Sequence, residues 1–177
     1  MEAIGDQALT VNLVFGTLVF AVAARIYLLQ KLNDWRPEAV LVPILLLHSQ
    51  RHLGLMFLAS GAIYSGMPAQ FAWPAAIGDL IAALLAFLAI PLILRDFQSA
   101  KAVLWVFNVF GVVDLIVAIV LANLFNARFY MVAAYWIPSF WVPALLVTHY
   151  IVFRILAGRG SSRSARSGSR LREKASP

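Results

Sequence analysis

The chain has 177 residues, of which 62% are hydrophobic and 12% are charged, and its formal net charge is +6. In a soluble domain about a quarter of all residues are charged, so this composition excludes a soluble globular protein and indicates one embedded in a membrane. The chain has no cysteine, which excludes disulfides, thiolate metal sites and cysteine nucleophiles. Seven of the 14 lysine and arginine residues lie at or after Arg154, so the apolar body carries few charges.

Five apolar segments are long enough to cross a bilayer as helices, each of which needs about 20 residues. These predicted spans cover residues 9–29, 39–63, 71–94, 103–124 and 131–156. The sequence therefore predicts an all-α integral membrane protein, a five-transmembrane-helix bundle over residues 1–157. Residues 158–177 are rich in serine, arginine and glycine, and we expect them to form a disordered basic cytoplasmic tail.

The distribution of lysine and arginine between the loops predicts the orientation. The N-terminus and the second loop carry none, whereas the first loop region carries three, the third two, the fourth one and the C-terminal end seven. This alternation places the N-terminus outside and the C-terminus in the cytoplasm of a multi-pass protein in a cell membrane, for which we favour the bacterial cytoplasmic membrane. Because the start of the chain is acidic, with Glu2 and Asp6, we expect a retained first span rather than a cleaved signal peptide.

The expected partners follow from the tail and from the size of the chain. Anionic lipid headgroups attract basic residues near a membrane surface by about 1 kcal/mol each, so we expect the tail to bind them. Nucleic acid is not an expected partner, because no aromatic residues alternate with the basic ones. A bundle of this size would need to form a homo-oligomer to enclose a full pathway.

Five consecutive polar residues, His48 to His52, interrupt the second predicted span. An ionisable residue at membrane depth is costly and is therefore a candidate for a pathway or a binding site. On a helix with 100° per residue, His48 and His52 share one face, and Gln50 lies on the opposite side. Because these polar side chains cover most of the circumference, we expect other helices to surround this one.

Two aspartates are the expected partners of Arg51. Asp79 lies in the third predicted span and Asp114 in the fourth, and alanines follow each of them on the same helix face. Small residues let membrane helices approach closely, so both carboxylates are predicted to face the bundle interior. An ion pair that merely fixes the helix register is the structural alternative to a functional role.

His149 and Asn108 complete the predicted cluster. His149 follows a Val-Pro-x-Leu-Leu stretch that resembles the one before His48, which leaves open an inverted repeat or a chance similarity between apolar helices. Depths counted at about 1.5 Å per residue predict a staircase of polar groups, from Asn108 and His149 up to Asp79. Trp141 lies deep enough to line a cavity.

Three functional hypotheses follow from these residues. The leading one is a small permease or channel-like protein that moves protons or a small solute, with Arg51 as the fixed counter-ion and anion clamp. With Arg51 charged and both aspartates ionised, the interior carries one net negative charge, which a proton could neutralise. The predicted pathway or binding residues are His48, Arg51, His52, Asp79, Asn108, Asp114 and His149.

The second hypothesis is a membrane-embedded metal or haem redox protein, and the third is a structural or accessory subunit. A metal site is not the favoured prediction, because Arg51 would repel a cation. If one exists, its ligands are expected among His48, His52, Asp79 and Asp114, and haem would need His149 as a further ligand. The sequence contains no enzyme motif, and it leaves open whether the protein is an enzyme and whether it binds a cofactor.

Overall fold

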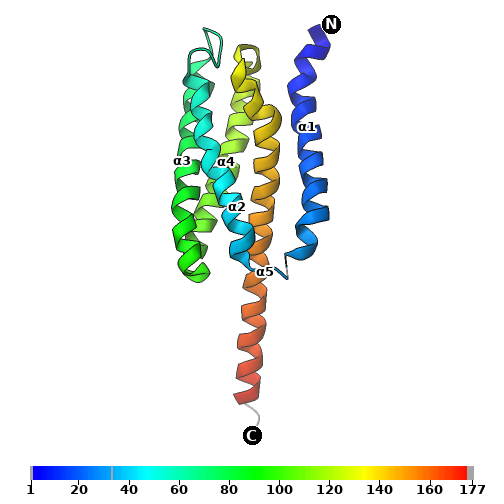
Figure 1. The fold of residues 1–177 in the computed structure, drawn as a ribbon, viewed down its shortest axis with the longest axis vertical. Coiled ribbons are helices and arrows are strands. Elements are labelled where there is room, and N and C mark those ends of the chain that lie inside the picture. Colours follow the sequence, from blue (N-terminus) through cyan, green and yellow to red (C-terminus); the bar gives the residue numbers. More distant parts are fainter. Residues whose placement is uncertain (1, 33, 175–177) are drawn as a thin grey trace.

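The computed structural model describes residues 2–32 and 34–174, and the side chains of residues 7–32 and 34–158. The described residues form helices and turns and no strand. Five helices are long and apolar enough to cross a membrane, which confirms the predicted number of spans. These spans cover Gln7–Lys31, Pro37–Leu58, Ala69–Arg95, Phe97–Leu124 and Ala133–Gly158. The α-helices that contribute to them are α1 (Glu2–Tyr27), α2 (Pro37–Ser49), α3 (Ala69–Arg95), α4 (Phe97–Leu124) and α5 (Val142–Lys174) (Figure 1). The disorder predicted for residues 158–177 falls mostly on residues whose side chains are not described, and it stays a prediction. The predicted orientation of the termini stays a prediction as well.

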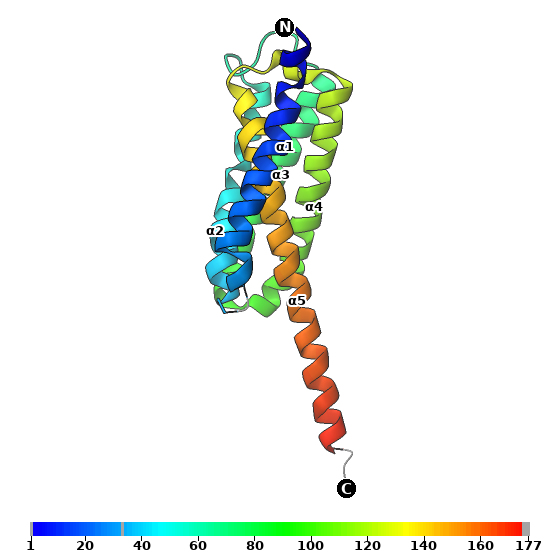
Figure 2. The same cartoon turned by 90° about the vertical axis from the view of Figure 1, so that its right-hand side faces the viewer.

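The helices form an elongated bundle in which α1 stands at one side (Figure 1). Helix α3 packs against α2 and α4, whereas α1 packs mainly along α5. The view turned by 90° shows α1 lying over the upper part of α5 (Figure 2). Helix α1 exposes many apolar side chains, such as Phe15 and Leu18, as a helix bordered by lipid does.

The fourth span begins at Phe97, six residues earlier than residue 103, the predicted start. The cause is Asp96, whose carboxylate accepts hydrogen bonds from the backbone N–H groups of Gln98 (3.0 Å) and Ser99 (3.0 Å). A carboxylate that accepts from the first free N–H groups of a helix is a favourable N-cap. The same residue ends α3, so one residue connects the two antiparallel helices.

Asp96→Ala is expected to lower the Tm more at neutral pH than in acid. The N–H groups of Gln98 and Ser99 hold the pKa of Asp96 below its ordinary value of 3.8. A lowered folded-state pKa means that the cap stabilises the protein above the ordinary pKa and that this contribution is lost as the pH falls through the folded-state value. The measurement is the Tm difference between wild type and variant from pH 7 downwards. A difference that does not shrink below pH 3.8 would contradict the charged cap.

The second span changes helix type at the polar segment. Helix α2 ends at Ser49, and the chain continues as a 3₁₀ helix, η2 (Gln50–Leu58). A 3₁₀ helix has three residues per turn, so side chains three apart lie above one another. The buried residues follow that period: His48, Arg51, Gly54 and Phe57.

The prediction that His48 and His52 share one helix face is therefore wrong. His52 does not share the face of His48 but is exposed, with its Nδ1 3.0 Å from the carbonyl of Ser49. Gln50 is exposed as well, so the second span is not surrounded by other helices on all sides. The span also ends at Leu58, earlier than the predicted residue 63.

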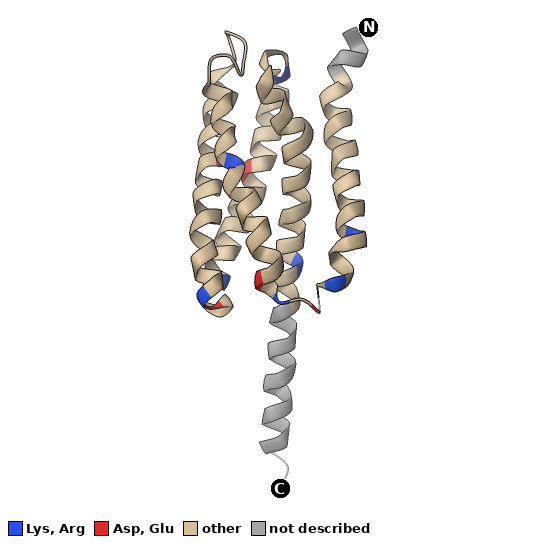
Figure 3. Cartoon of the chain, viewed as in Figure 1, with Lys and Arg blue, Asp and Glu red and all other residues tan. Residues whose placement is uncertain are grey.

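Buried apolar side chains of the described residues pack in three clusters: two larger ones on either side of a layer of polar residues, and a small one of Leu115, Val142 and Leu145. The larger region joins α2, the end of α3, the start of α4 and α5, around residues such as Leu45, Leu104 and Ile151. A second region, around Phe57 and Phe71, lies at the end of the bundle where α3 begins. Among α2, α3 and α4, the charged residues gather at helix ends except for one group near mid-height (Figure 3).

Candidate functional site: a buried arginine between two aspartates

Arg51 lies at the centre of the polar layer, and its side chain is fully buried (0% exposed). Its Nε donates to Oδ1 of Asp79 at 2.7 Å, and its Nη2 donates to Oδ2 of Asp114 at 2.5 Å. Its Nη1 donates to the backbone carbonyl of Gly111 at 3.2 Å. The predicted pairing of Arg51 with an aspartate is confirmed, and both aspartates bind it at once. One guanidinium thereby joins η2, α3 and α4.

His149 lies on the other side of the same guanidinium, with Nε2 3.5 Å from Nη1 of Arg51. Asn108 Nδ2 donates to the backbone carbonyl of His149 at 3.2 Å, which leaves Asn108 Oδ1 as an acceptor. His149 Nδ1 lies 2.7 Å from that oxygen and therefore carries a proton. In the neutral ring Nε2 is then an acceptor, and it faces the Arg51 donor.

Asn108→Leu is expected to destabilise the protein by about 1–3 kcal/mol, because it leaves the buried Nδ1–H of the His149 ring without an acceptor and removes the additional donor to the His149 carbonyl. Thermal unfolding of the purified protein in detergent measures the effect. Asn123→Leu is the matched control, because Asn123 is exposed and its Nδ2 donates only to the Ile119 carbonyl of its own helix. Equal Tm values for the two variants would contradict the buried network.

His48 is fully buried beside His149, with 4.3 Å between the ring centroids. The hydroxyl of Thr148 donates to the Ala144 carbonyl at 2.8 Å. It is therefore an acceptor for His48 Nε2–H, which lies 2.9 Å away. The other nitrogen of this ring, Nδ1, has no hydrogen-bond partner among the described residues, and in this tautomer it carries a free lone pair.

Three glycines make room for the cluster, and the sequence analysis gave them no role. A Cβ atom at Gly54 would collide with the carboxylate of Asp79, and one at Gly78 would collide with that of Asp114. A Cβ atom at Gly111 would lie 2.6 Å from Nε2 of His149. Their distance in the sequence from the charged residues could have indicated this role. Gly54 is three residues after Arg51, Gly78 precedes Asp79, and Gly111 is three residues before Asp114.

The structure brings together six of the seven residues predicted for the site. They are His48, Arg51, Asp79, Asn108, Asp114 and His149. The seventh, His52, lies outside the cluster for the reason given above. Whether the six residues form a pathway stays a prediction.

The predicted staircase of depths is wrong at Asp114, which lies as deep as Asp79. Asn108 precedes Asp114 by six residues on the same helix and therefore stays about 9 Å nearer the Phe97 end, as the staircase predicts. Counting from Phe97 instead of residue 103 moves Asp114 deeper into the bundle. At about 1.5 Å per residue, it lies about 25 Å from that end of the helices, level with Asp79 at about 24 Å from Arg95. The role of Arg51 as an anion clamp is also overturned, because its fully buried guanidinium binds protein acceptors.

The geometry of the cluster does not suit a metal ion. Among the described residues, no three histidine, cysteine, aspartate or glutamate side chains converge so that they could hold one. Asp79 and Asp114 each bind the positively charged guanidinium instead. His52, one of the four ligands considered, is exposed.

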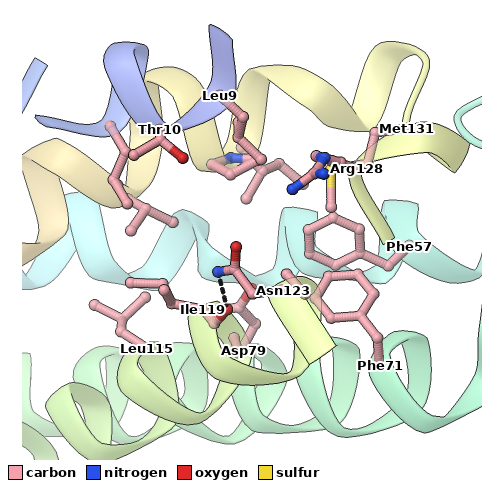
Figure 4. A pocket seen from close by; sticks show the side chains of 16 residues that line it. Leu9, Thr10, Phe57, Phe71, Asp79, Leu115, Ile119, Asn123, Arg128 and Met131 are labelled. Atoms are coloured by element: carbon pink, nitrogen blue, oxygen red, sulfur yellow. Dashed lines mark hydrogen bonds between the residues drawn. The ribbon is translucent and has the colours of Figure 1, made fainter. Parts of the chain in front are cut away.

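A cavity of about 70 Å³ reaches the cluster from the end of the bundle where α3 begins. Its walls come from α1, α3, α4 and the segments between α4 and α5, and Figure 4 shows Leu9 and Thr10 of α1 across from Ile119 and Asn123 of α4. Most lining side chains are apolar: Leu9, Leu13, Phe57, Phe71, Leu115, Ala118, Ile119, Ala122, Met131, Ile137, Pro138 and Val142. Asp79 also lines the cavity, so one carboxylate of the cluster is accessible from it.

A second, smaller cavity of about 10 Å³ touches Arg51, Gly54, Asp79 and Trp141. This is close to the minimum volume that a single water molecule requires. The indole Nε1 of Trp141 is buried and has no hydrogen-bond partner among the described residues. The expectation that Trp141 lines a cavity is confirmed.

The fold and the buried cluster define a class: a five-helix membrane protein with one ion-paired arginine in its interior. Residues 8–157 match the model of a family described as a domain of unknown function (DUF8737), and the chain belongs to that family. The comparisons with curated proteins and with solved structures found no significant match.

Proposed function

We propose that this protein is a small permease or channel-like protein that carries a small solute or protons past the Arg51 cluster. The observation that supports this most is the position of Asp79. Its Oδ1 binds the buried guanidinium, while its side chain also lines a cavity that reaches the end of the bundle. A carboxylate shared between a buried charge and an accessible cavity can exchange a proton or a cation with that cavity.

Charge counting supports the same proposal. Arg51 contributes one positive charge and Asp79 and Asp114 one negative charge each, while the hydrogen bonds of His149 fit its neutral form. At these formal charges the cluster carries one net negative charge in an apolar surrounding. Because a charge within a membrane is costly, binding one proton or one cation stabilises the cluster.

Access to the cluster differs between its two sides. The cavity connects Asp79 with one end of the bundle. Towards the other end, buried apolar side chains such as Leu45, Leu104 and Phe107 fill the interior. Transporters work by opening a central site to one side at a time, and this arrangement fits one of the two states.

Irregular helix segments flank the site. Beside the 3₁₀ helix η2 lies a π-helical turn, η5 (Ile137–Trp141), which carries Pro138 and contributes to both cavities. Segments of 3₁₀ and π helix often mark hinges or functional sites within longer helices. We propose that conformational changes in η2 and η5 open the path from the cluster to the end of the bundle that is now filled by apolar side chains.

Proton flux into vesicles tests the proposal. Purified protein is placed in liposomes that contain a pH-sensitive dye, and a pH difference is imposed. We expect wild type to dissipate the difference, Asp79→Asn and Asp114→Asn to lose most of this flux, and Asp96→Asn to behave as wild type. Wild-type flux no faster than in protein-free vesicles would contradict the proposed proton transport. Unchanged flux in Asp79→Asn and Asp114→Asn, together with a lower Tm, would assign the cluster a structural role.

A further inference from the structure

The geometry points to a small organic cation as the ligand of the 70 Å³ cavity: a protonated amine on a short apolar body. The ammonium group binds Asp79, and the apolar body lies against the cavity walls. This inference rests on the proposed function, because it names the solute that the same site takes. Three observations carry it.

The first observation is the unused oxygen of Asp79. Its Oδ1 accepts from Arg51, whereas Oδ2 accepts no hydrogen bond from any described residue. The Asp79 side chain is 11% exposed, while that of Arg51 is 0% exposed. Asp79 lines the cavity and Arg51 does not, so a ligand in the cavity meets this carboxylate and not the guanidinium. An N–H donor with a positive charge forms the stronger, charge-assisted hydrogen bond with such an oxygen.

The second observation is the sign of the charge. At formal charges Arg51, Asp79 and Asp114 sum to one negative charge. A bound monocation brings this sum to zero, whereas a bound anion would double the negative charge. In an apolar interior the electrostatic free energies of these two bound states differ strongly, because charges are little screened there. The site therefore selects cations over anions of the same size.

The third observation is the nature of the walls. The lining side chains that approach Asp79 are apolar, and Phe57 and Phe71 pack edge to face with 4.9 Å between their centroids. An inorganic cation would need several oxygen ligands, and within the described residues no three carboxylate or histidine side chains converge to supply them. An alkyl chain instead removes apolar surface from water, at about 25 cal/mol per Å².

Arg128 also lines the cavity, but at a different depth. It belongs to η3 (Ala127–Tyr130), which follows the end of α4. Its guanidinium carbon lies 4.7 Å from the centroid of the Phe129 ring. Asp79 lies ten residues after Ala69, the first residue of α3, which is about 15 Å along the helix axis. Asp79 therefore determines the charge in the inner part of the cavity, where an ammonium group would bind.

Calorimetric titration of the full chain in detergent with propylammonium, propanol and propionate tests the inference. These probes have similar size and differ in charge. We expect propylammonium to bind at least about tenfold more tightly than the other two, because a hydrogen bond to a charged group is worth more than a tenfold change in affinity. Asp79→Asn should weaken propylammonium binding by a similar factor. Asp96→Asn is the matched control, since Asp96 is an exposed aspartate that does not line the cavity.

A second variant protects the test against misfolding of Asp79→Asn. Ala118→Leu adds bulk to the cavity wall from α4 and leaves the three charged residues in place. It should also weaken propylammonium binding while helix content is retained. Binding of propanol or propionate as tight as that of propylammonium would overturn the inference, as would full propylammonium affinity in both variants. Binding without flux would contradict the proposed transport alone, whereas proton flux without propylammonium binding would contradict this inference alone.

Discussion

Arg51→Met is expected to lower the free energy of unfolding by about 3–5 kcal/mol, the usual cost of removing one partner from a buried ion pair. The variant leaves the carboxylates of Asp79 and Asp114 without their guanidinium inside the bundle. It also leaves the Gly111 carbonyl without the donor that Arg51 supplies. For a chain of this size the loss corresponds to a fall in Tm of about 10 °C, measured by circular dichroism in detergent.

Two comparisons separate the ion pairs from general effects of the substitution. Arg25→Met removes an exposed arginine from α1 and should change the Tm little. The triple variant Arg51→Met, Asp79→Asn, Asp114→Asn has no unpaired buried charge, and it should recover much of the stability lost in Arg51→Met. If the triple variant were less stable than Arg51→Met alone, the uncompensated carboxylates would not be the cause of the loss.

Gly78→Ala is expected to destabilise the protein by about 1–3 kcal/mol, the range for overpacking a filled interior. The new Cβ would overlap the carboxylate of Asp114. That carboxylate has little freedom to move, because Oδ2 binds Arg51 at 2.5 Å. The collision therefore disturbs the ion pair as well as the contact between α3 and α4. An alanine in a helix gains up to about 1 kcal/mol over glycine, and the overlap outweighs this gain.

Gly158→Ala is the control for the same substitution without the collision. Outside the backbone of its own helix, no atom of the described residues lies within 4 Å of a Cβ built at Gly158 of α5. The helix gain therefore meets no collision there, and the Tm should stay equal or rise. Both variants are compared by thermal unfolding in one detergent. A Gly78→Ala protein as stable as wild type would show that Asp114 can shift without breaking its bond to Arg51.

The broad architecture was predictable from the sequence because it depends on local composition. An apolar segment of about 20 residues forms a helix in a bilayer, since no other local structure satisfies its backbone polar groups there. The five spans follow directly from this rule. The convergence of Arg51 with Asp79 and Asp114 was predictable too, because isolated charges at membrane depth require partners.

Only the tertiary structure decided which side chains face the interior and what can reach them. The second span becomes a 3₁₀ helix at Gln50, and three residues per turn direct Arg51 inward and leave His52 outside. The roles of Gly54, Gly78 and Gly111 depend on which helix lies opposite each one, as does the cavity that reaches Asp79. Sequence pattern determines where a chain becomes helical and apolar, because those preferences act between near neighbours. Helix rotation and contact are determined by packing between residues far apart in the chain, and the site of this protein is formed by such contacts.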